Sequence, residues 1–351
     1  MYSIFEPAQL GPMMLKNRTV RSATNEHLAQ RDGSFTQAWA DAQVELAEGG
    51  VGLIITGHVA VDPTQRADEG QPAMREDIDL PLLAQTCAAV HSHGCKIVMQ
   101  LSHTGLKAPQ SVNGQPPKGP DDFSKEELNT LVEQFRRGAL MAQRSGFDGV
   151  QIHNAHGYLL SSFMNPEQNH RTDEYGDSME NRFRLTGTII EAVRRICGPG
   201  FAILAKVDCN STDDFPGLLK LYQHAGVDGV EVSGLDFAAR AGEKDPFYLR
   251  QALEAQKGLE LPLILVGGMF SRPAAERVLQ AGIPFVSFSR ALICQPDFIN
   301  RMARGEVSAC LACNGCYKVY RSRPVRCVQH QEPIPQLAKV FGVEADRNSQ
   351  E

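Results

Sequence analysis

Ser145-Gly-Phe-Asp-Gly-Val-Gln-Ile-His153 is the stretch that decides the fold class. A glycine suited to the end of a helix is followed, within a few residues, by a short apolar run. Glycine is favoured there because a left-handed backbone costs little without a Cβ atom. The run is rich in Val and Ile, as is typical of a strand covered on both faces. The same pattern recurs at 48–57, 225–233 and 281–288.

Eight such apolar runs are separated by helical segments, of which the best marked begins with the capping box Ser124-Lys-Glu-Glu127. Alternating strands and helices imply parallel strands joined by crossovers. Eight units predict an α/β protein with a single (β/α)8 TIM barrel. An open doubly wound sheet is the alternative, but no early Gly-rich dinucleotide fingerprint is present. The predicted strands are Arg18–Ser22, Gly52–Gly57, Lys96–Leu101, Gly149–His153, Ile203–Val207, Gly229–Ser233, Leu263–Gly267 and Phe285–Phe288.

The pattern ends near residue 300 of the 351-residue chain. We therefore expect a barrel domain over 1–305 and a short Cys-rich C-terminal extension over 306–351, packed on the barrel. The formal net charge of −6 argues against nucleic-acid binding, because a protein with a net negative charge does not attract a polyanion. Apolar runs such as Val51–Thr56 are too short to span a bilayer, and no signal peptide is visible. These features predict a cytoplasmic protein without a membrane association.

Chemistry in such a barrel is expected at the carboxyl ends of the strands and in the loops that follow them. Gly267-Gly268 and Ser289-Arg290 follow the last two predicted strands, where this fold usually binds phosphate. Glycines let backbone N–H groups approach an anion, and arginine adds a forked donor. The alternative is that the two glycines form only a turn. The loop from Thr104 to Asp122 is expected to line the pocket.

His153-Asn-Ala-His156-Gly-Tyr158 follows the fourth predicted strand. Two histidines three residues apart suit a metal site, a buried structural pair or a catalytic pair. No acidic third ligand stands at a suitable local spacing, and the position at a strand end argues against a purely structural pair. A tyrosine beside two imidazoles suits proton donation to a carbanion-like centre.

Four of the nine cysteines form the pattern C-x2-C-x2-C-x10-C at Cys310, Cys313, Cys316 and Cys327. Four thiolates at such spacing can ligate a [4Fe–4S] cluster. A structural zinc ion or four free thiols are the alternatives.

The residues around His153 resemble a known family. His153-Asn-Ala-His-Gly-Tyr-Leu-Leu-Ser-Ser-Phe163 is similar to the H-x-A-[HN]-G-Y-L-L-x-Q-F signature of old yellow enzyme relatives. Further matches are Asn165-Pro-Glu-Gln-Asn169, Arg171-Thr-Asp-Glu-Tyr-Gly176, Asn181-Arg182, Ile4-Phe-Glu-Pro7, Leu15-Lys-Asn-Arg18 and Gln100-Leu-Ser-His-Thr-Gly105. The resemblance covers roughly residues 3 to 330. The cysteine pattern is similar to that of the trimethylamine dehydrogenase and 2,4-dienoyl-CoA reductase branch.

The resemblance implies non-covalent FMN and a set of residues around it. Ser22, Ala23 and the His58 backbone would border the isoalloxazine ring, and Gln100 would bind its pyrimidine edge. Lys206 would lie near N1 and O2, where a cation stabilises reduced flavin. Gly267, Gly268, Ser289 and Arg290 would hold the phosphate.

Four positions depart from the family pattern. Asn25 stands where many relatives have a Thr or Cys that tunes the flavin, which puts the flavin potential in doubt. Lys206 replaces the commoner Arg. Its ammonium group is a compact single charge, whereas the planar guanidinium of Arg can donate two parallel hydrogen bonds. Ser287 and Ser289 replace phosphate-loop glycines, so we expect their hydroxyls to contact the phosphate.

The resemblance also implies a reaction. His153 and His156 would polarise a substrate carbonyl, and Tyr158 would protonate the α carbon after hydride reaches the β carbon. NAD(P)H would reduce the flavin first, in a ping-pong cycle. The chain would then be an ene-reductase acting on small α,β-unsaturated carbonyl compounds. The alternatives are a flavin amine dehydrogenase or demethylase, and an iron–sulfur electron-transfer module. The candidate assemblies are a homo-oligomer and a complex with a separate electron-transfer partner.

Overall fold

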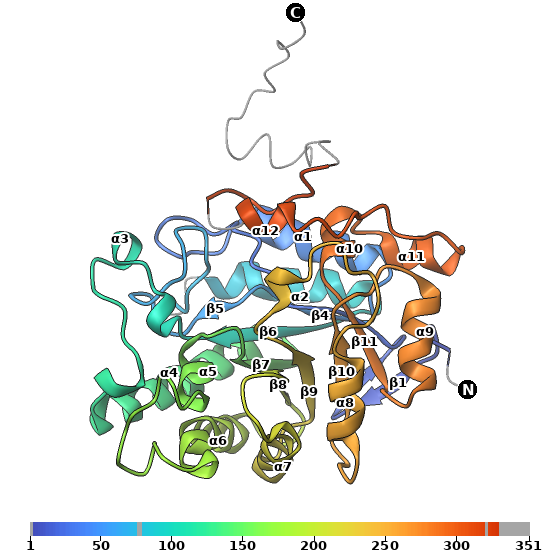
Figure 1. Cartoon of the computed structure of the whole chain (residues 1–351). Coiled ribbons are helices and arrows are strands. Elements are labelled where there is room, and N and C mark those ends of the chain that lie inside the picture. The colour runs from blue at the N-terminus through green and yellow to red at the C-terminus, as the bar shows by residue number, and fades with distance from the viewer. Residues whose placement is uncertain (1–2, 76–78, 320–321, 330–351) are drawn as a thin grey trace, which may run out of the picture.

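A closed ring of parallel strands forms the centre of the molecule in the computed structural model, which describes residues 3–75, 79–319 and 322–329 (Figure 1). Around the ring, β4 pairs with β3, then follow β11, β10, β9, β8, β7 and β6, and β6 pairs back with β4. The eight strands are β3 (Thr19–Arg21), β4 (Leu53–Ile55), β6 (Lys96–Ser102), β7 (Gly149–Asn154), β8 (Ala202–Asp208), β9 (Gly229–Ser233), β10 (Leu263–Val266) and β11 (Phe285–Phe288).

The predicted barrel is confirmed, and each predicted strand overlaps a strand of the ring. All strands of the ring are buried along their length except for the first residue of β6, because helices cover the outside and side chains fill the inside. A short additional strand, β5 (Val59–Ala60), pairs with the end of β6.

Helices surround the ring, as Figure 1 shows for α4, α6 and α7 below it in that view. The predicted capping box is present: Ser124 Oγ accepts from the N–H of Glu127 (3.2 Å), and Glu127 Oε2 accepts from the N–H of Ser124 (2.9 Å). The long helices are α1 (Gln37–Glu48), α2 (Leu80–Ser92), α4 (Lys125–Arg144), α6 (Met179–Cys197), α7 (Phe215–Ala225), α8 (Leu249–Gln256) and α9 (Arg272–Gln280).

One hairpin was not predicted from the sequence. Strands β1 (Ala8–Leu10) and β2 (Met13–Leu15) pair antiparallel. Their buried residues Leu10 and Leu15 belong to one apolar cluster with side chains of the barrel strands, such as Phe285. The hairpin therefore packs against the apolar part of the barrel interior, and it leaves the polar part to the opposite end.

The described part of the C-terminal extension contains helix α12 (Gly315–Val319) and follows helices α10 (Arg290–Cys294) and α11 (Phe298–Ala303) along the chain. Asn314 Nδ2 donates to the carbonyl of Ala238 (2.9 Å), and the N–H of Val325 donates to the carbonyl of Glu26 (2.9 Å). The division at residue 305 remains a prediction, and residues 330–351 lie outside the described part of the chain.

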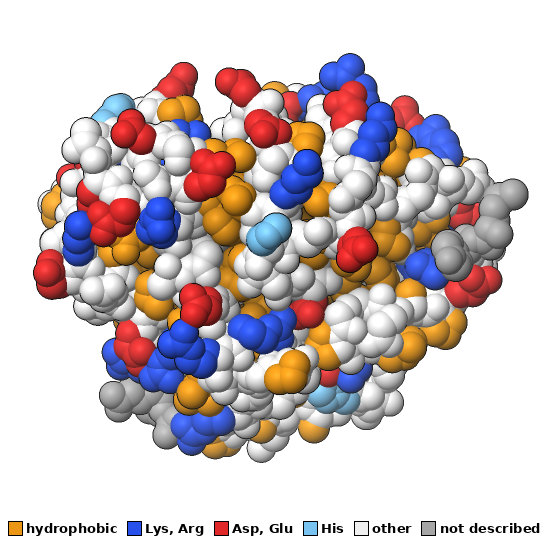
Figure 2. Space-filling model, turned by 90° about the horizontal axis from the view of Figure 1, so that it is seen from below, with side chains coloured by type: hydrophobic (Ala, Val, Ile, Leu, Met, Phe, Trp, Pro, Cys, Tyr) orange, Lys and Arg blue, Asp and Glu red, His pale blue; other side chains and the backbone are white. Residues whose placement is uncertain are grey.

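Acidic and basic side chains are interspersed on the face drawn in Figure 2. Among the described helices, none combines the length and apolar character needed to cross a membrane. The predicted cytoplasmic location remains a prediction.

Candidate active site

A single cavity collects almost all the residues that the sequence singled out. It lies at the carboxyl ends of the strands, where a barrel of this kind places its chemistry. The predicted residues that line it are Ser22, Ala23, Asn25, His58, Gln100, His153, His156, Tyr158, Lys206, Gly267, Ser289 and Arg290. Cys316 lines it as well, whereas the predicted residues Gly268, Cys310, Cys313 and Cys327 do not. Lys107, from the loop expected to line the pocket, is also present.

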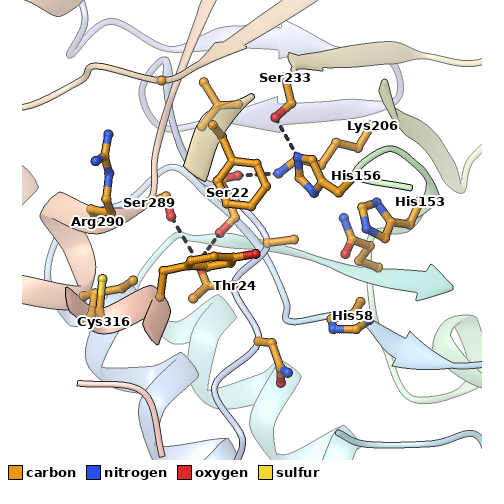
Figure 3. A pocket seen from close by; sticks show the side chains of 18 of the residues that line it. Ser22, Thr24, His58, His153, His156, Lys206, Ser233, Ser289, Arg290 and Cys316 are labelled. Atoms are coloured by element: carbon orange, nitrogen blue, oxygen red, sulfur yellow. Dashed lines mark hydrogen bonds between the residues drawn. The ribbon is translucent and has the colours of Figure 1, made fainter. Parts of the chain in front are cut away.

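His58, His153 and His156 lie at one end of the cavity, opposite Arg290 and Ser289 in Figure 3. The ring centroids of His153 and His156 are 5.4 Å apart, and those of His153 and Tyr158 are 4.9 Å apart. His58 lies 5.1 Å from Tyr158. His153 Nδ1 is buried and has no hydrogen-bond partner among the described residues, so this nitrogen is available to a ligand.

Both histidines are neutral near pH 7. Burial, followed by the positive charges of neighbouring groups, lowers the pKa of His153 well below 6.5. Burial and the nearby Lys206 and Lys107 likewise lower the pKa of His156. A neutral imidazole carries one N–H donor and one acceptor nitrogen, so each ring can donate one hydrogen bond to a substrate oxygen.

His156 is held by a buried carboxylate. Its backbone has φ of +61°, a left-handed conformation that costs energy for a residue with a Cβ atom. Asp208 Oδ2, at the end of β8, accepts from the backbone N–H of His156. The imidazole Nε2 lies 2.9 Å from Ser233 Oγ and 3.7 Å from Asp208 Oδ1. The turn after β7 is thus fixed by residues from β8 and β9.

Asp208 is itself an unusual acid. Its side chain is fully buried, and within the part of the chain that the structure describes its Oδ1 atom has no hydrogen-bond partner. Burial raises the pKa of Asp208 to about 7, although the N–H of His156 and the charge of Lys206 oppose that rise. Sequence reasoning missed this residue, although an acid at a strand end of a barrel is a usable signal.

Lys206 places a positive charge beneath the cavity. Its ammonium group donates to Ser22 Oγ (2.7 Å), a bond drawn in Figure 3, and lies 3.3 Å from Glu231 Oε2. The side chain is only 4% exposed. A buried ammonium needs such partners, because an isolated charge is strongly disfavoured away from water.

Asn25 is fixed by a second buried carboxylate. Its Nδ2 donates to Asp68 Oδ2 (2.6 Å), and its Oδ1 accepts from the backbone N–H of His27 (3.2 Å). Asp68 Oδ1 also lies 2.8 Å from His27 Nδ1. Both ends of the Asn25 amide are therefore engaged, and its orientation in the cavity wall is set.

Two glycines with a left-handed backbone form the loop after β10. Gly267 and Gly268 have φ of +112° and +77°. A Cβ atom on Gly268 would lie 1.7 Å from the carbonyl oxygen of Asp245, so only glycine fits. The expected contact of Ser287 with the phosphate is not supported: Ser287 is absent from the cavity lining, and its hydroxyl donates to Glu231.

Arg290 connects this end of the cavity to the extension. Its Nη1 donates to Asn314 Oδ1 (2.6 Å) and to the carbonyl of Ala312 (3.1 Å). Burial lowers the pKa of Arg290, and the nearby cysteines oppose that shift.

The four predicted cysteines meet in one place. Cys310, Cys313, Cys316 and Cys327 all line a second, smaller cavity. This cavity shares Arg290, Ile293, Asn314 and Cys316 with the large one. Among the described residues, no group of three or more His, Cys, Asp or Glu side chains is placed to hold a metal ion.

Aromatic side chains that sequence reasoning missed complete the large cavity. They are Phe237, Phe247, Tyr248 and Tyr317. Phe237 lies between His156 (4.8 Å) and Tyr317 (5.1 Å), measured between ring centroids. Phe247 and Tyr248 lie in a turn, Phe237 lies in a 3₁₀ helix and Tyr317 in α12, all outside the repeated strand and helix pattern. The spacing of apolar residues carries little information there.

A family profile described as NADH:flavin oxidoreductase / NADH oxidase matches residues 3–308. The chain belongs to this family. It is 30% identical to an NADH oxidase of Thermoanaerobacter brockii, over 93% of this chain and 55% of that protein. It is also 30% identical to a 4,4'-dithiodibutanoate disulfide reductase of Rhodococcus erythropolis, over 97% of this chain and 98% of that protein. The chain thus spans about half the length of one of these relatives and nearly all of the other.

Solved structures agree on the fold. An old yellow enzyme homologue of Zymomonas mobilis superposes with a TM-score of 0.77, at 24% identity, over 92% of this chain and 100% of that one. The family membership confirms the resemblance drawn from the His153 motif.

Proposed function

We propose that this member of the NADH:flavin oxidoreductase family binds FMN in the large cavity. In this proposal it uses NAD(P)H to reduce activated C=C bonds of α,β-unsaturated carbonyl compounds. The observation that carries the proposal is the cluster of neutral His153 and His156 beside Tyr158, in the same cavity as the buried cation Lys206.

The residues of the cavity suit FMN. Lys206 supplies a buried positive charge for the anionic reduced ring, and Gln100 supplies an amide for its polar edge. Gly267, with its left-handed backbone, and the Arg290 guanidinium suit the phosphate end. Ser22, Ala23 and His58 complete the proposed set around the ring.

Bound FMN would supply the hydride acceptor and donor. The N–H groups of His153 and His156 would donate to the carbonyl oxygen of the substrate and stabilise the negative charge that develops there. Tyr158 would then deliver its phenolic proton to the α carbon. The aromatic side chains and the burial of Tyr158 would keep water away from this centre.

The Tyr158→Phe variant tests the proton donor. We expect it to bind FMN and to be reduced by NAD(P)H at the normal rate. Its reoxidation by cyclohexenone should be slowed by a factor on the order of 10² to 10⁴, the usual contribution of a positioned general acid. Stopped-flow absorbance separates the two half-reactions. An unchanged oxidative half-reaction would exclude Tyr158 as the donor.

Amine oxidation is the second candidate function. The cavity wall contains Phe237, Phe247, Tyr248 and Tyr317, and aromatic faces attract cationic substrates. Reduction of the bound flavin by methylated amines, followed anaerobically without NAD(P)H, would favour this function. Reoxidation by enones with no reduction by amines would favour the first.

We further propose that the cysteine cavity holds a [4Fe–4S] cluster that exchanges electrons with the flavin and with a separate partner protein. The support is that all four cysteines line one small cavity, and that Cys316 also lines the large one. Iron and acid-labile sulfide, assayed on protein purified without oxygen, test this: about four irons per chain are expected.

A further inference from the structure

Glu231 is a charged residue in the middle of strand β9, and its side chain is fully buried. The carboxylate has partners from three other strands. Ser287 Oγ on β11 donates to Oε1 (2.7 Å). Gln151 Nε2 on β7 donates to Oε2 (3.1 Å), and Lys206 Nζ on β8 lies 3.3 Å from Oε2. Glu231 therefore joins strands β7, β8, β9 and β11 directly beneath Lys206.

The first consequence concerns amide orientation. An ionised carboxylate can only accept hydrogen bonds, so Gln151 must turn its NH₂ group toward Glu231. Its carbonyl oxygen then faces Gln100, whose Nε2 donates to it (2.6 Å). Gln100, which lines the cavity, therefore turns its own Oε1 away from Gln151 as an acceptor for another partner. The carboxylate thus determines which end of the Gln151 amide donates, and through it which end of the Gln100 amide donates.

The second consequence concerns charge. Lys206 and Glu231 form an ion pair that is almost fully buried, and among the described residues the other partner of the ammonium is the uncharged Ser22 hydroxyl. The positive charge beneath the cavity is therefore largely offset. Because hydride transfer to a flavin yields an anion, an offset charge stabilises the reduced form less than an unpaired lysine would.

We propose that Glu231 is a positioning residue that lowers the reduction potential of the bound flavin by neutralising Lys206 and fixes Gln100 as a hydrogen-bond acceptor. This inference rests on the proposed binding of FMN. It predicts that the carboxylate, and not only the packing around it, controls the balance between oxidised and reduced flavin.

The test is the Glu231→Gln variant, which keeps the size of the side chain and an acceptor oxygen but removes the charge. We expect reduced FMN to bind at least tenfold more tightly relative to oxidised FMN than in the wild type. For a two-electron couple this corresponds to a rise in potential of about 30 mV. The potential is measured by anaerobic equilibration with a reference dye, and the dissociation constant of oxidised FMN by fluorescence quenching.

Ser287→Ala is the matched control, because it removes one hydrogen bond to Glu231 and keeps the charge. Its potential should equal that of the wild type. If Glu231→Gln and Ser287→Ala both lower the melting temperature and leave the potential unchanged, Glu231 has only a structural role and the inference is overturned. If the wild type itself binds no FMN, the proposed function fails. This outcome differs from an unchanged potential in variants that do bind FMN, which overturns the inference about Glu231 alone.

A second comparison covers the case in which Glu231→Gln does not fold, since removing one partner of a buried pair is costly. The double variant Lys206→Gln/Glu231→Gln removes both charges together and leaves no unpaired buried charge. Because the pair carries little net charge, the potential of this variant should stay close to that of the wild type. A fall of about 30 mV or more would show that the charge of Lys206 is not offset and would overturn the inference.

Discussion

Replacing Asp208 by Asn should abolish a pH dependence of stability that the buried carboxyl creates. Asn keeps a carbonyl oxygen that can accept the backbone N–H of His156, so the left-handed turn can persist. It cannot ionise, however, and the burial that raises the pKa of Asp208 to about 7 then has no effect. The difference between the two proteins isolates this one group from all others that titrate.

The magnitude follows from the two pKa values. The folded state holds its proton up to about pH 7, whereas the unfolded chain releases it near 3.8. The folded state therefore binds more protons between these values, and stability falls as the pH rises. Linkage between about pH 5 and about pH 8 gives a loss of roughly 2 to 3 kcal/mol from this carboxyl. Because the Asp208 side chain is fully buried, solvent screening does not reduce this contribution to the free energy of unfolding.

The assay is equilibrium urea unfolding of both proteins at these two pH values, at two FMN concentrations so that ligand linkage can be subtracted. The free energy of unfolding of Asp208→Asn minus that of the wild type should increase by about 2 to 3 kcal/mol from pH 5 to pH 8. A difference that stays the same at both pH values would refute the assignment of a raised pKa to this carboxyl.

Two further predictions concern the ends of the cavity. Gly268→Ala should destabilise the protein by about 2 to 5 kcal/mol, from the left-handed backbone and the clash with the carbonyl of Asp245. Gly258→Ala is the control in urea unfolding, because Gly258 has φ of +78° but a Cβ atom added there would meet nothing within 4 Å. The control should therefore lose only about 1 to 2 kcal/mol of unfolding free energy, from the left-handed backbone alone. Equal losses in the two variants would contradict the clash at Gly268. Cys316→Ser should lose most of the iron measured in the wild type, because four thiolates hold such a cluster. Cys95→Ser, a buried cysteine outside the cavity, should keep its iron; equal iron in both variants would contradict the cluster site.

The barrel was predictable because its signals are periodic and repeated. The strand Gly149–Asn154 and its equivalents are short, apolar and preceded by glycine-terminated helices, so each supports the others. The β1–β2 hairpin was not predictable in this way. Its strands of three residues each are too short for alternation to be read, and they are stabilised by contacts with the barrel interior.

The site was predictable where a residue stands at a strand end or in a motif, as for His153 and Arg290. Glu231 was missed although it leaves a signal, a charge within the apolar run Val230-Glu-Val232. A buried strand tolerates such a charge only with partners, and those partners lie on other strands, at positions that one sequence does not relate to each other. The aromatic wall was missed because loop geometry decides which side chains face inward.

The contact between the two ends of the barrel has a consequence for how the protein is made. Strand β3 pairs with β11, and the backbone of Val325 binds that of Glu26, across almost 300 residues of sequence. Ser22 and Ser289 face the same cavity from these two ends. During synthesis, the first wall of the cavity emerges from the ribosome long before the last. The proposed cofactor can therefore be captured only after translation has passed β11, and flavin fluorescence quenching would time the closure of the ring.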